Sequence, residues 1–176
     1  MKYNPDKHAR RSIRLRGYEY TQSGAYFVTI CTQNRACLFG EVVKGAMDAN
    51  DAGQMIQSVW DELPQHYSGV DVDAFVVMPN HIHGIILLTS DETGQPQGVA
   101  PTMSLMNVVH RFKSLTTARY RQGVIQRRWQ PFPGRLWQRN YYEHIIRHEE
   151  DMNRARGYIA ANPLMWHLDA ENPNTL

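Results

Sequence analysis

The sequence predicts one α+β domain spanning residues 1–176, an antiparallel sheet with helices packed on its face. Three observations lead to this prediction. Segments of strand and helix character follow one another in the order strand, helix, strand, strand, helix, strand, helix. A Pro79-Asn80 break separates two of the strands, which favours an antiparallel hairpin. Apolar residues make up 42% and charged residues 20% of the chain, the usual composition of a globular domain with its own core.

The first three elements are predicted from local composition and periodicity. Ala25–Thr32 (AYFVTICT) is rich in β-branched and aromatic residues, which predicts a strand. After a turn at residues 33–36, Phe39–Val43 is expected to form a short partner strand. Asp51–Tyr67 predicts an amphipathic helix, because its apolar residues recur at helical spacing. These apolar residues are Met55, Ile56, Val59, Trp60 and Leu63.

The middle of the chain contains the hairpin and a second helix. Val70–Met78 and His81–Leu88 predict its two strands. Thr89–Pro101, rich in Gly, Pro and polar residues, predicts a loop. Ser104–Gln122 then predicts a helix with one apolar face. Its other face carries basic residues, namely Arg111, Lys113 and Arg119.

The last two elements are a strand and a helix. Trp137–Arg147 (WQRNYYEHIIR) contains the strand, and Glu149–Asn162 predicts the helix. Three acidic residues open this helix and suit the positive end of its dipole. Pro163 lies where the helix must stop, since proline cannot continue it.

Positive charge is segregated along the chain, although the net charge is only +2. Residues 1–16 and 111–147 hold 15 of the 19 Lys and Arg residues and 2 of the 17 Asp and Glu residues. Clustered cations gain free energy when they release counterions from phosphate, so the pattern indicates a face that binds a polyanion. Chance clustering on a solvated surface is the alternative.

Several classes of protein are excluded by absent features. No run of 18 apolar residues exists, so no membrane span is expected. The basic N-terminus lacks the apolar stretch of a secretory signal. Cys31 and Cys37 are too few for a disulfide framework, and their spacing is not that of a zinc knuckle. We therefore expect a cytoplasmic protein with two reduced thiols.

His81 and His83 are one residue apart in a predicted strand. Side chains alternate across a strand, so both imidazoles are expected on one face, where they can share a metal ion. Gly84 follows and is expected to leave room for a ligand or backbone to approach. A surface histidine in an ordinary sheet is the alternative. A structural zinc site completed by Cys31 and Cys37 also stays open.

Tyr158 lies on the last predicted helix, about a quarter-turn from its apolar stripe. That stripe consists of Met152, Ala155 and Ile159. An aromatic residue in this place often only covers the core. Alternatively, Tyr158 presents its hydroxyl to a phosphate, and Asn162, one turn further on, supplies an oxygen ligand or orients a water. A phenol with a pKa near 10 is a poor nucleophile, so this role requires a cation nearby, such as a metal on the histidine pair.

Four segments resemble the HUH transposases. The metal-binding strand of that family is similar to Ala74–Ile86 (AFVVMPNHIHGII). The tyrosine-helix region of its single-tyrosine members is similar to Trp137–Arg147 and to Gly157–Pro163 (GYIAANP). The start of the family resembles RRSIRLRGYEYTQSGAYFVTICTQNR. The resemblance spans residues 10–166 and is strongest to the REP-associated tyrosine transposases.

The resemblance implies a ferredoxin-like sheet with the histidine pair on a central strand. It implies Mg²⁺ or Mn²⁺ held by His81 and His83, and attack by Tyr158 on a DNA phosphate. The products would be a 5′-phosphotyrosine link and a free 3′-hydroxyl, and the substrates single-stranded DNA with imperfect hairpins. Many insertion-sequence members carry Gln where this chain has Asn162, and the shorter side chain leaves direct ligation of the metal by Asn162 open.

The resemblance also implies that the basic segments bind DNA. The N-terminal arm, residues 1–19, and the Arg-rich segment after residue 110 would contact the DNA backbone. The residues expected to do so are Arg11, Arg14, Arg16, Arg111, Lys113, Arg139 and Arg147. Nearby aromatic residues either stack on unpaired bases or pack in the core, namely Trp129, Phe132, Trp137, Tyr141 and Tyr142. His144 is a candidate to reach the site, and His148 is expected near the cap of the last helix.

Two alternatives to the transposase hypothesis stay open. One is a metal-dependent hydrolase with zinc on the histidine pair and no covalent step. The other is a non-catalytic regulator that binds hairpin DNA. The sequence does not identify the target DNA or the cleavage position. It does not decide between a monomer and a homodimer, nor, in a homodimer, whether Tyr158 acts with the histidines of its own chain or of its partner. It also does not show whether the gene moves itself or serves host repeats.

Overall fold

The computed structural model describes residues 23–89 and 103–175. The basic arm, with Arg11, Arg14 and Arg16, lies outside these ranges, as does most of the loop expected at residues 89–101.

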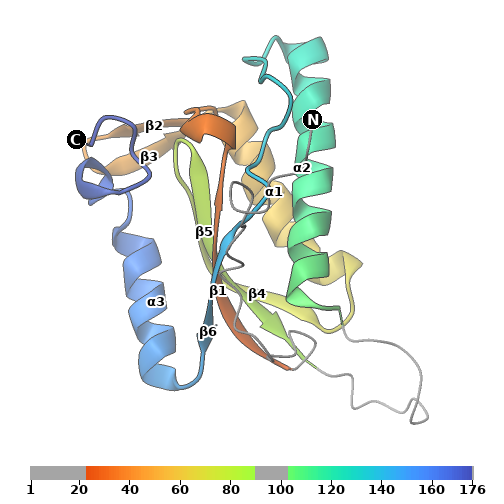
Figure 1. The fold of residues 1–176 in the computed structure, drawn as a ribbon, viewed down its shortest axis with the longest axis vertical. Coiled ribbons are helices and arrows are strands. Elements are labelled where there is room, and N and C mark those ends of the chain that lie inside the picture. Colours follow the sequence, from red (N-terminus) through yellow and green to blue (C-terminus); the bar gives the residue numbers. More distant parts are fainter. Residues whose placement is uncertain (1–22, 90–102, 176) are drawn as a thin grey trace, which may run out of the picture.

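A four-stranded antiparallel sheet forms the centre of the molecule (Figure 1). Its strands are β1 (Gly24–Cys31), β4 (Val70–Val77), β5 (His81–Leu88) and β6 (Tyr142–Ile146), in the spatial order β4-β5-β1-β6. The connection from β1 to β4 runs through a helix, and β5, which follows β4, lies between the two. This is the split βαβ arrangement of ferredoxin-like folds. The predicted α+β class and the antiparallel hairpin are confirmed, and β5 is a central strand.

Helices cover both faces of the sheet (Figure 1). On one face, α1 (Asp51–His66) and α2 (Leu105–Arg127) enclose the main core with alternate residues of β1 and β5. On the other face, α3 (Glu149–Ala161) packs through a smaller cluster around Phe27, Ile85 and Ile159. The period of two along β5 thus sends Ile82 into the main core and leaves its neighbours at positions 81 and 83 on the face of α3.

A separate hairpin corrects one prediction. Residues 39–43 were expected to pair with the first strand, but β2 (Gly40–Val43) pairs with β3 (Ala46–Ala49), a strand that the sequence pattern did not indicate. Lys44 and Gly45 both have positive φ angles, 52° and 77°, as tight hairpin turns require. Four-residue strands are too short to show a clear alternation, which explains why β3 was missed.

Helix ends follow side-chain caps. Asn50 accepts a hydrogen bond from the Gly53 N–H at the start of α1, and His148 caps α3 through the Asp151 N–H, as its position suggested. The second helix, α2, ends at Arg127, five residues beyond the expected end. None of the described helices combines the length and apolar character that a membrane span needs.

Gly84 does leave room for a close approach, but the approaching group is the side chain of Trp60 rather than the expected ligand or backbone. A Cβ atom at this position would come within 2.4 Å of the indole of Trp60. That indole stacks on Phe75 and meets Phe112 edge-on. Gly84 lies on the face of β5 opposite the histidines, and its missing side chain lets α1 pack against the sheet.

Candidate metal centre beside Tyr158

The two histidines meet beneath α3. His81 and His83 are 0% and 3% exposed, and their Nε2 atoms lie 3.0 Å apart. The expectation that both rings share one face of the strand is therefore confirmed. Two metal–ligand bonds of about 2.1 Å at a right angle span about 3.0 Å, so one ion fits both nitrogens.

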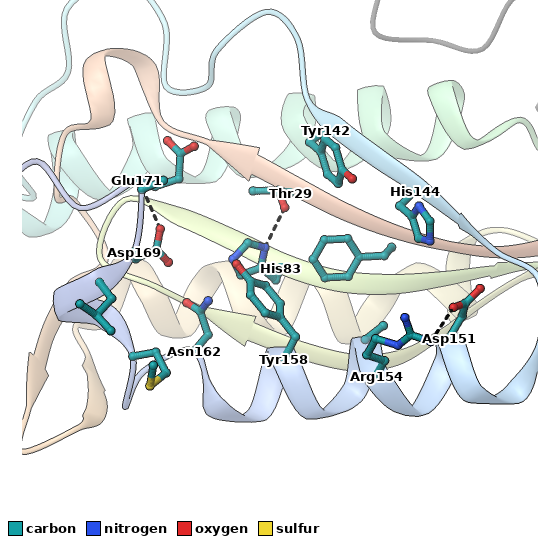
Figure 2. Close-up of a pocket in the computed structure, with 15 residues that line it drawn as sticks. Thr29, His83, Tyr142, His144, Asp151, Arg154, Tyr158, Asn162, Asp169 and Glu171 are labelled. Carbon is teal, nitrogen blue, oxygen red and sulfur yellow. Dashed lines mark hydrogen bonds and ion pairs between the residues drawn. The ribbon is translucent and has the colours of Figure 1, made fainter. Parts of the chain in front are cut away.

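Hydrogen bonds fix the orientation of both rings. Asn80 donates through Nδ2 to the carbonyls of Arg35 and Glu171, which leaves its Oδ1 to accept from His81 Nδ1 at 2.8 Å. His81 Nε2 then carries a lone pair. His83 Nδ1 is held by Thr29 Oγ1 at 2.8 Å, from the neighbouring strand (Figure 2). Such outer contacts are what keep metal-binding imidazoles in the required tautomer.

Burial keeps both imidazoles uncharged. Loss of solvent lowers the pKa of His81 to about 4, and an interaction with the Asn162 side chain partly opposes this shift. Loss of solvent, together with His81, lowers the pKa of His83 to about 3, partly opposed by the negative charge of Asp169. Both rings are neutral at physiological pH, which is the form that binds metals.

Asp169 is a third group at this point, and the sequence pattern did not indicate it. Its Oδ2 lies 3.7 Å from His81 Nε2, and ligand atoms of His81, His83 and Asp169 all lie within 4.8 Å of one another. In residues 23–89 and 103–175, this group of three can hold a metal ion, and neither cysteine belongs to it. The alternative of a zinc site with Cys31 and Cys37 is therefore not supported.

Tyr158 reaches the same point from α3. Its ring stands edge-on to His83, with centroids 5.1 Å apart, and edge-on to Phe27 at 5.8 Å. The side chain is 51% exposed, so it does not simply cover the core. Partial burial and the charge of Asp169 raise the pKa of the phenol, and a hydrogen bond with Asn162 lowers it.

Asn162 lies between the tyrosine and the histidines. It is 3% exposed, and its side chain raises the pKa of His81 and lowers that of Tyr158. Its Oδ1 is buried without a hydrogen-bond partner in the described part of the chain, and the same is true of Asp169 Oδ2. Two buried oxygens without partners beside two imidazole nitrogens are a donor set that suits a divalent cation.

An open cavity of about 850 Å³ lies in front of these groups (Figure 2). Its walls include Thr29, His83, Tyr158 and Asp169, and at the other end Tyr142 and His144. His144 thus lines the same cavity as His83, although it does not belong to the group formed by His81, His83 and Asp169. Arg154 contributes a positive charge to the cavity wall and was not among the expected DNA contacts.

The expected DNA-binding residues are dispersed. Arg111 lines a smaller cavity on α2, on the opposite side of the sheet from Tyr158. Lys113 donates to the carbonyls of Gln138, Arg139 and Asn140. The side chains of Arg139 and Arg147 are exposed before and after β6. None of these four lines the large cavity.

The aromatic residues divide between the core and the cavity. Trp137 is 4% exposed, and Trp129 and Phe132 pack on Tyr120, so these three serve the core. The ring of Tyr141 lies under the Lys113 ammonium. Tyr142 is the exception, because it is about half exposed and lines the large cavity.

Comparisons with known proteins agree with this arrangement. Residues 20–162 match the family model described as "Transposase IS200 like". The chain is 39% identical over 183 residues to an uncharacterized protein of Haemophilus influenzae, covering 96% of each. It is 25% identical over 151 residues to a protein of the same organism named as a REP-associated tyrosine transposase, covering 83% of this chain and 73% of that one.

A solved structure shares the fold. It is a REP-associated tyrosine transposase bound to a REP hairpin. The TM-score is 0.60 at 20% sequence identity, over 88% of this chain and 74% of the other.

Proposed function

The chain belongs to the IS200-like transposase family, and from this premise we propose that it cuts and rejoins single-stranded DNA through a covalent bond to Tyr158. The observation that carries the proposal is the position of this exposed phenol beside His83, at the mouth of a cavity with room for a nucleotide. A tyrosine that only packed against the core would not leave half of its surface exposed there.

The residues at the site fit the Mg²⁺ or Mn²⁺ ion that the family implies. His81 and His83 would hold it through Nε2, and the buried Oδ1 of Asn162 lacks another partner. When bound, such an ion polarises a phosphate and offsets the charge that develops on it.

The chain's own groups prepare the nucleophile. Asn162 orients the Tyr158 hydroxyl and lowers the pKa of the phenol, against the effect of burial. The phenol oxygen attacks phosphorus, the bond from phosphorus to the 3′-oxygen breaks, and that oxygen leaves as a hydroxyl while the phenol gives up its proton. Attack by a 3′-hydroxyl on the phosphotyrosine reverses these changes and rejoins the strand, so no external energy source is needed.

Hairpin DNA is the proposed substrate. The similar solved structure is a REP-associated tyrosine transposase bound to a REP hairpin, and this chain shares its fold. Basic residues concentrate in two stretches, which suits contacts with phosphates. Tyr142 lies at the edge of the cavity with an exposed ring, where an unpaired base could stack.

A covalent adduct tests the proposal. The full-length protein is incubated with a single-stranded hairpin oligonucleotide and Mg²⁺ or Mn²⁺, and a denaturing gel separates free from protein-linked DNA. We expect an adduct with the wild type and with Tyr142→Phe, a matched control in the same cavity. Tyr158→Phe should bind the hairpin but form no adduct.

The other outcomes separate the alternatives. Cleavage by Tyr158→Phe without an adduct would identify a metal-dependent hydrolase. A wild-type protein that binds hairpins and never cuts them, with either metal, would identify a regulator. Loss of the adduct in Tyr142→Phe with its retention in Tyr158→Phe would move the nucleophile to residue 142.

A further inference from the structure

We propose that Asp169, in the C-terminal segment formed by residues 163–175, is a carboxylate ligand of the metal ion. This inference rests on the ion of the proposed function. It goes beyond that function because Asp169 lies outside residues 20–162, which match the family model. The site would then consist of two imidazole nitrogens, the Asn162 amide oxygen and a carboxylate, in place of the histidines and the amide alone.

The two carboxylate oxygens of Asp169 have different surroundings. Oδ1 accepts a hydrogen bond of 2.7 Å from the Glu171 N–H, which shapes the turn. Oδ2 lies toward the histidines, 3.7 Å from His81 Nε2, and has no hydrogen-bond partner among the described residues. The side chain is only 7% exposed. A buried carboxylate oxygen without a partner is costly, and a cation shared with the neighbouring nitrogens removes that cost.

The segment that carries Asp169 is held in place by contacts of other residues. Asn80 Nδ2 donates to the Glu171 carbonyl at 2.7 Å, and the Arg35 guanidinium pairs with the Glu171 carboxylate at 2.9 Å. The ring of Trp166 lies over His81 with centroids 5.9 Å apart. The carboxylate of Asp169 therefore does not have to form an ion pair to bring the segment to the site.

One amide connects both parts of the site. Asn80 orients His81 through Oδ1 and holds the backbone of the C-terminal segment through Nδ2. The separation between His81 and Asp169 is thus set by a buried side chain that is 0% exposed. Two imidazole nitrogens, an amide oxygen and a carboxylate would leave further positions of a six-coordinate ion for phosphate oxygens. Oxygen ligands also suit Mg²⁺ and Mn²⁺.

Metal binding without DNA tests the inference. Mn²⁺ is titrated into the metal-free, full-length protein, and unbound Mn²⁺ is measured by electron paramagnetic resonance. Asp169→Asn keeps an oxygen for the Glu171 N–H, removes the charge and replaces the oxygen nearest His81 with an amide NH2 group. Asp151→Asn is the matched control, because Asp151 lines the same cavity from α3 and does not belong to the group of His81, His83 and Asp169.

We expect the Mn²⁺ dissociation constant to rise by about tenfold or more in Asp169→Asn, the scale on which even outer contacts change metal affinity. Asp151→Asn should stay within about twofold of the wild type. Equal binding by Asp169→Asn and the wild type would overturn the inference. So would equal weakening in both variants, which would indicate a long-range effect of charge, or a wild type that binds no Mn²⁺.

A second variant tests the inference in case Asp169→Asn does not fold. Asp169→Cys replaces a hard ligand with a soft thiolate, so the affinity for Cd²⁺ relative to Mn²⁺ should rise above the wild-type ratio. An unchanged ratio would contradict direct ligation. Failure of the proposed function has a different signature, namely a wild type with Asp169-dependent Mn²⁺ binding that forms no DNA adduct. An adduct together with Mn²⁺ binding that is independent of Asp169 would overturn this inference alone.

Discussion

The ring of Tyr158 meets the ring of His83 edge-on, with centroids 5.1 Å apart and planes inclined by 69°. One comes from α3 and the other from β5, and both belong to the same chain. The groups proposed for catalysis are therefore brought together within one chain by the docking of α3 on the sheet.

The first prediction concerns this arrangement within one chain. A mixture of Tyr158→Phe and His83→Ala proteins should form no DNA adduct, because each variant lacks one half of its own site. The measurement is the denaturing gel, and the control is wild-type protein at the same total protein concentration as the mixture. Adduct formation by the mixture would mean that the tyrosine of one chain serves the histidines of another.

The second prediction concerns the support of His83. Thr29→Val removes the hydroxyl that holds His83 Nδ1 and keeps the shape of the side chain. We expect Mn²⁺ affinity to fall by about tenfold, the lower end of effects seen for outer contacts of metal ligands. Thr29→Ser retains the hydroxyl and should bind Mn²⁺ nearly as the wild type does. Titration of both variants decides whether the hydroxyl matters.

The third prediction contrasts two glycines. Gly84→Ala places a methyl group against the enclosed indole of Trp60 and should lower the free energy of unfolding by about 1–3 kcal/mol, as overpacking does. Gly157→Ala, on the exposed side of α3, meets no atom within 4 Å and should raise the free energy of unfolding by about 0.5–1 kcal/mol through its higher helix propensity. Urea unfolding measures both, and similar values for the two would contradict the assigned packing of β5.

The fourth prediction concerns Lys113, which was expected to bind DNA. Burial lowers the pKa of this amine to about 8, and its nitrogen donates to three backbone carbonyls before β6. Lys113→Met should therefore lower the free energy of unfolding by about 1–3 kcal/mol, the cost of leaving buried polar groups unpaired.

Arg111→Met, on the same helix, is the matched comparison for Lys113. It should leave stability nearly unchanged and reduce the salt dependence of hairpin binding by about one counterion if Arg111 contacts a phosphate. Equal stability of the Lys113→Met protein and the wild type would return Lys113 to the DNA-binding set.

The fifth prediction is a dependence on pH. Arg156 of α3 forms two hydrogen bonds, of 2.8 and 2.7 Å, with Asp73 of β4, and these hold the pKa of Asp73 below its usual value of 3.8. A depressed carboxyl pKa stabilises the fold above 3.8, and the contribution disappears as the pH falls through the folded-state pKa.

Thermal unfolding between pH 2 and pH 7 checks this sign. Asp73→Asn should melt below the wild type at pH 5 to 7, and the two curves should converge at the acid end. Arg156→Gln should show the same profile. A difference in melting temperature that grows as the pH falls would contradict the pairing.

Much of the fold could be predicted because its elements are defined by local patterns. The composition of residues 25–32 and the helical spacing in residues 51–67 each identify an element without knowledge of its neighbours. The hairpin at residues 40–49 could not be predicted in this way. Its strands are short, and their pairing depends on the turn at Lys44 and Gly45. The sequence pattern therefore paired residues 39–43 with the first strand, whereas β2 pairs with β3.

The sequence by itself determined which side chains share a face within one element. The two-residue period of a strand brings His81 and His83 together, and the helical period brings Asn162 near Tyr158. Tertiary structure alone decided which elements meet. The strand order places Thr29 beside His83, and the turn after α3 brings Asp169 to His81 from 88 residues away in the chain. Residue spacing determines which side chains point the same way from one helix or strand, whereas distances between elements depend on how each element packs to bury its apolar face.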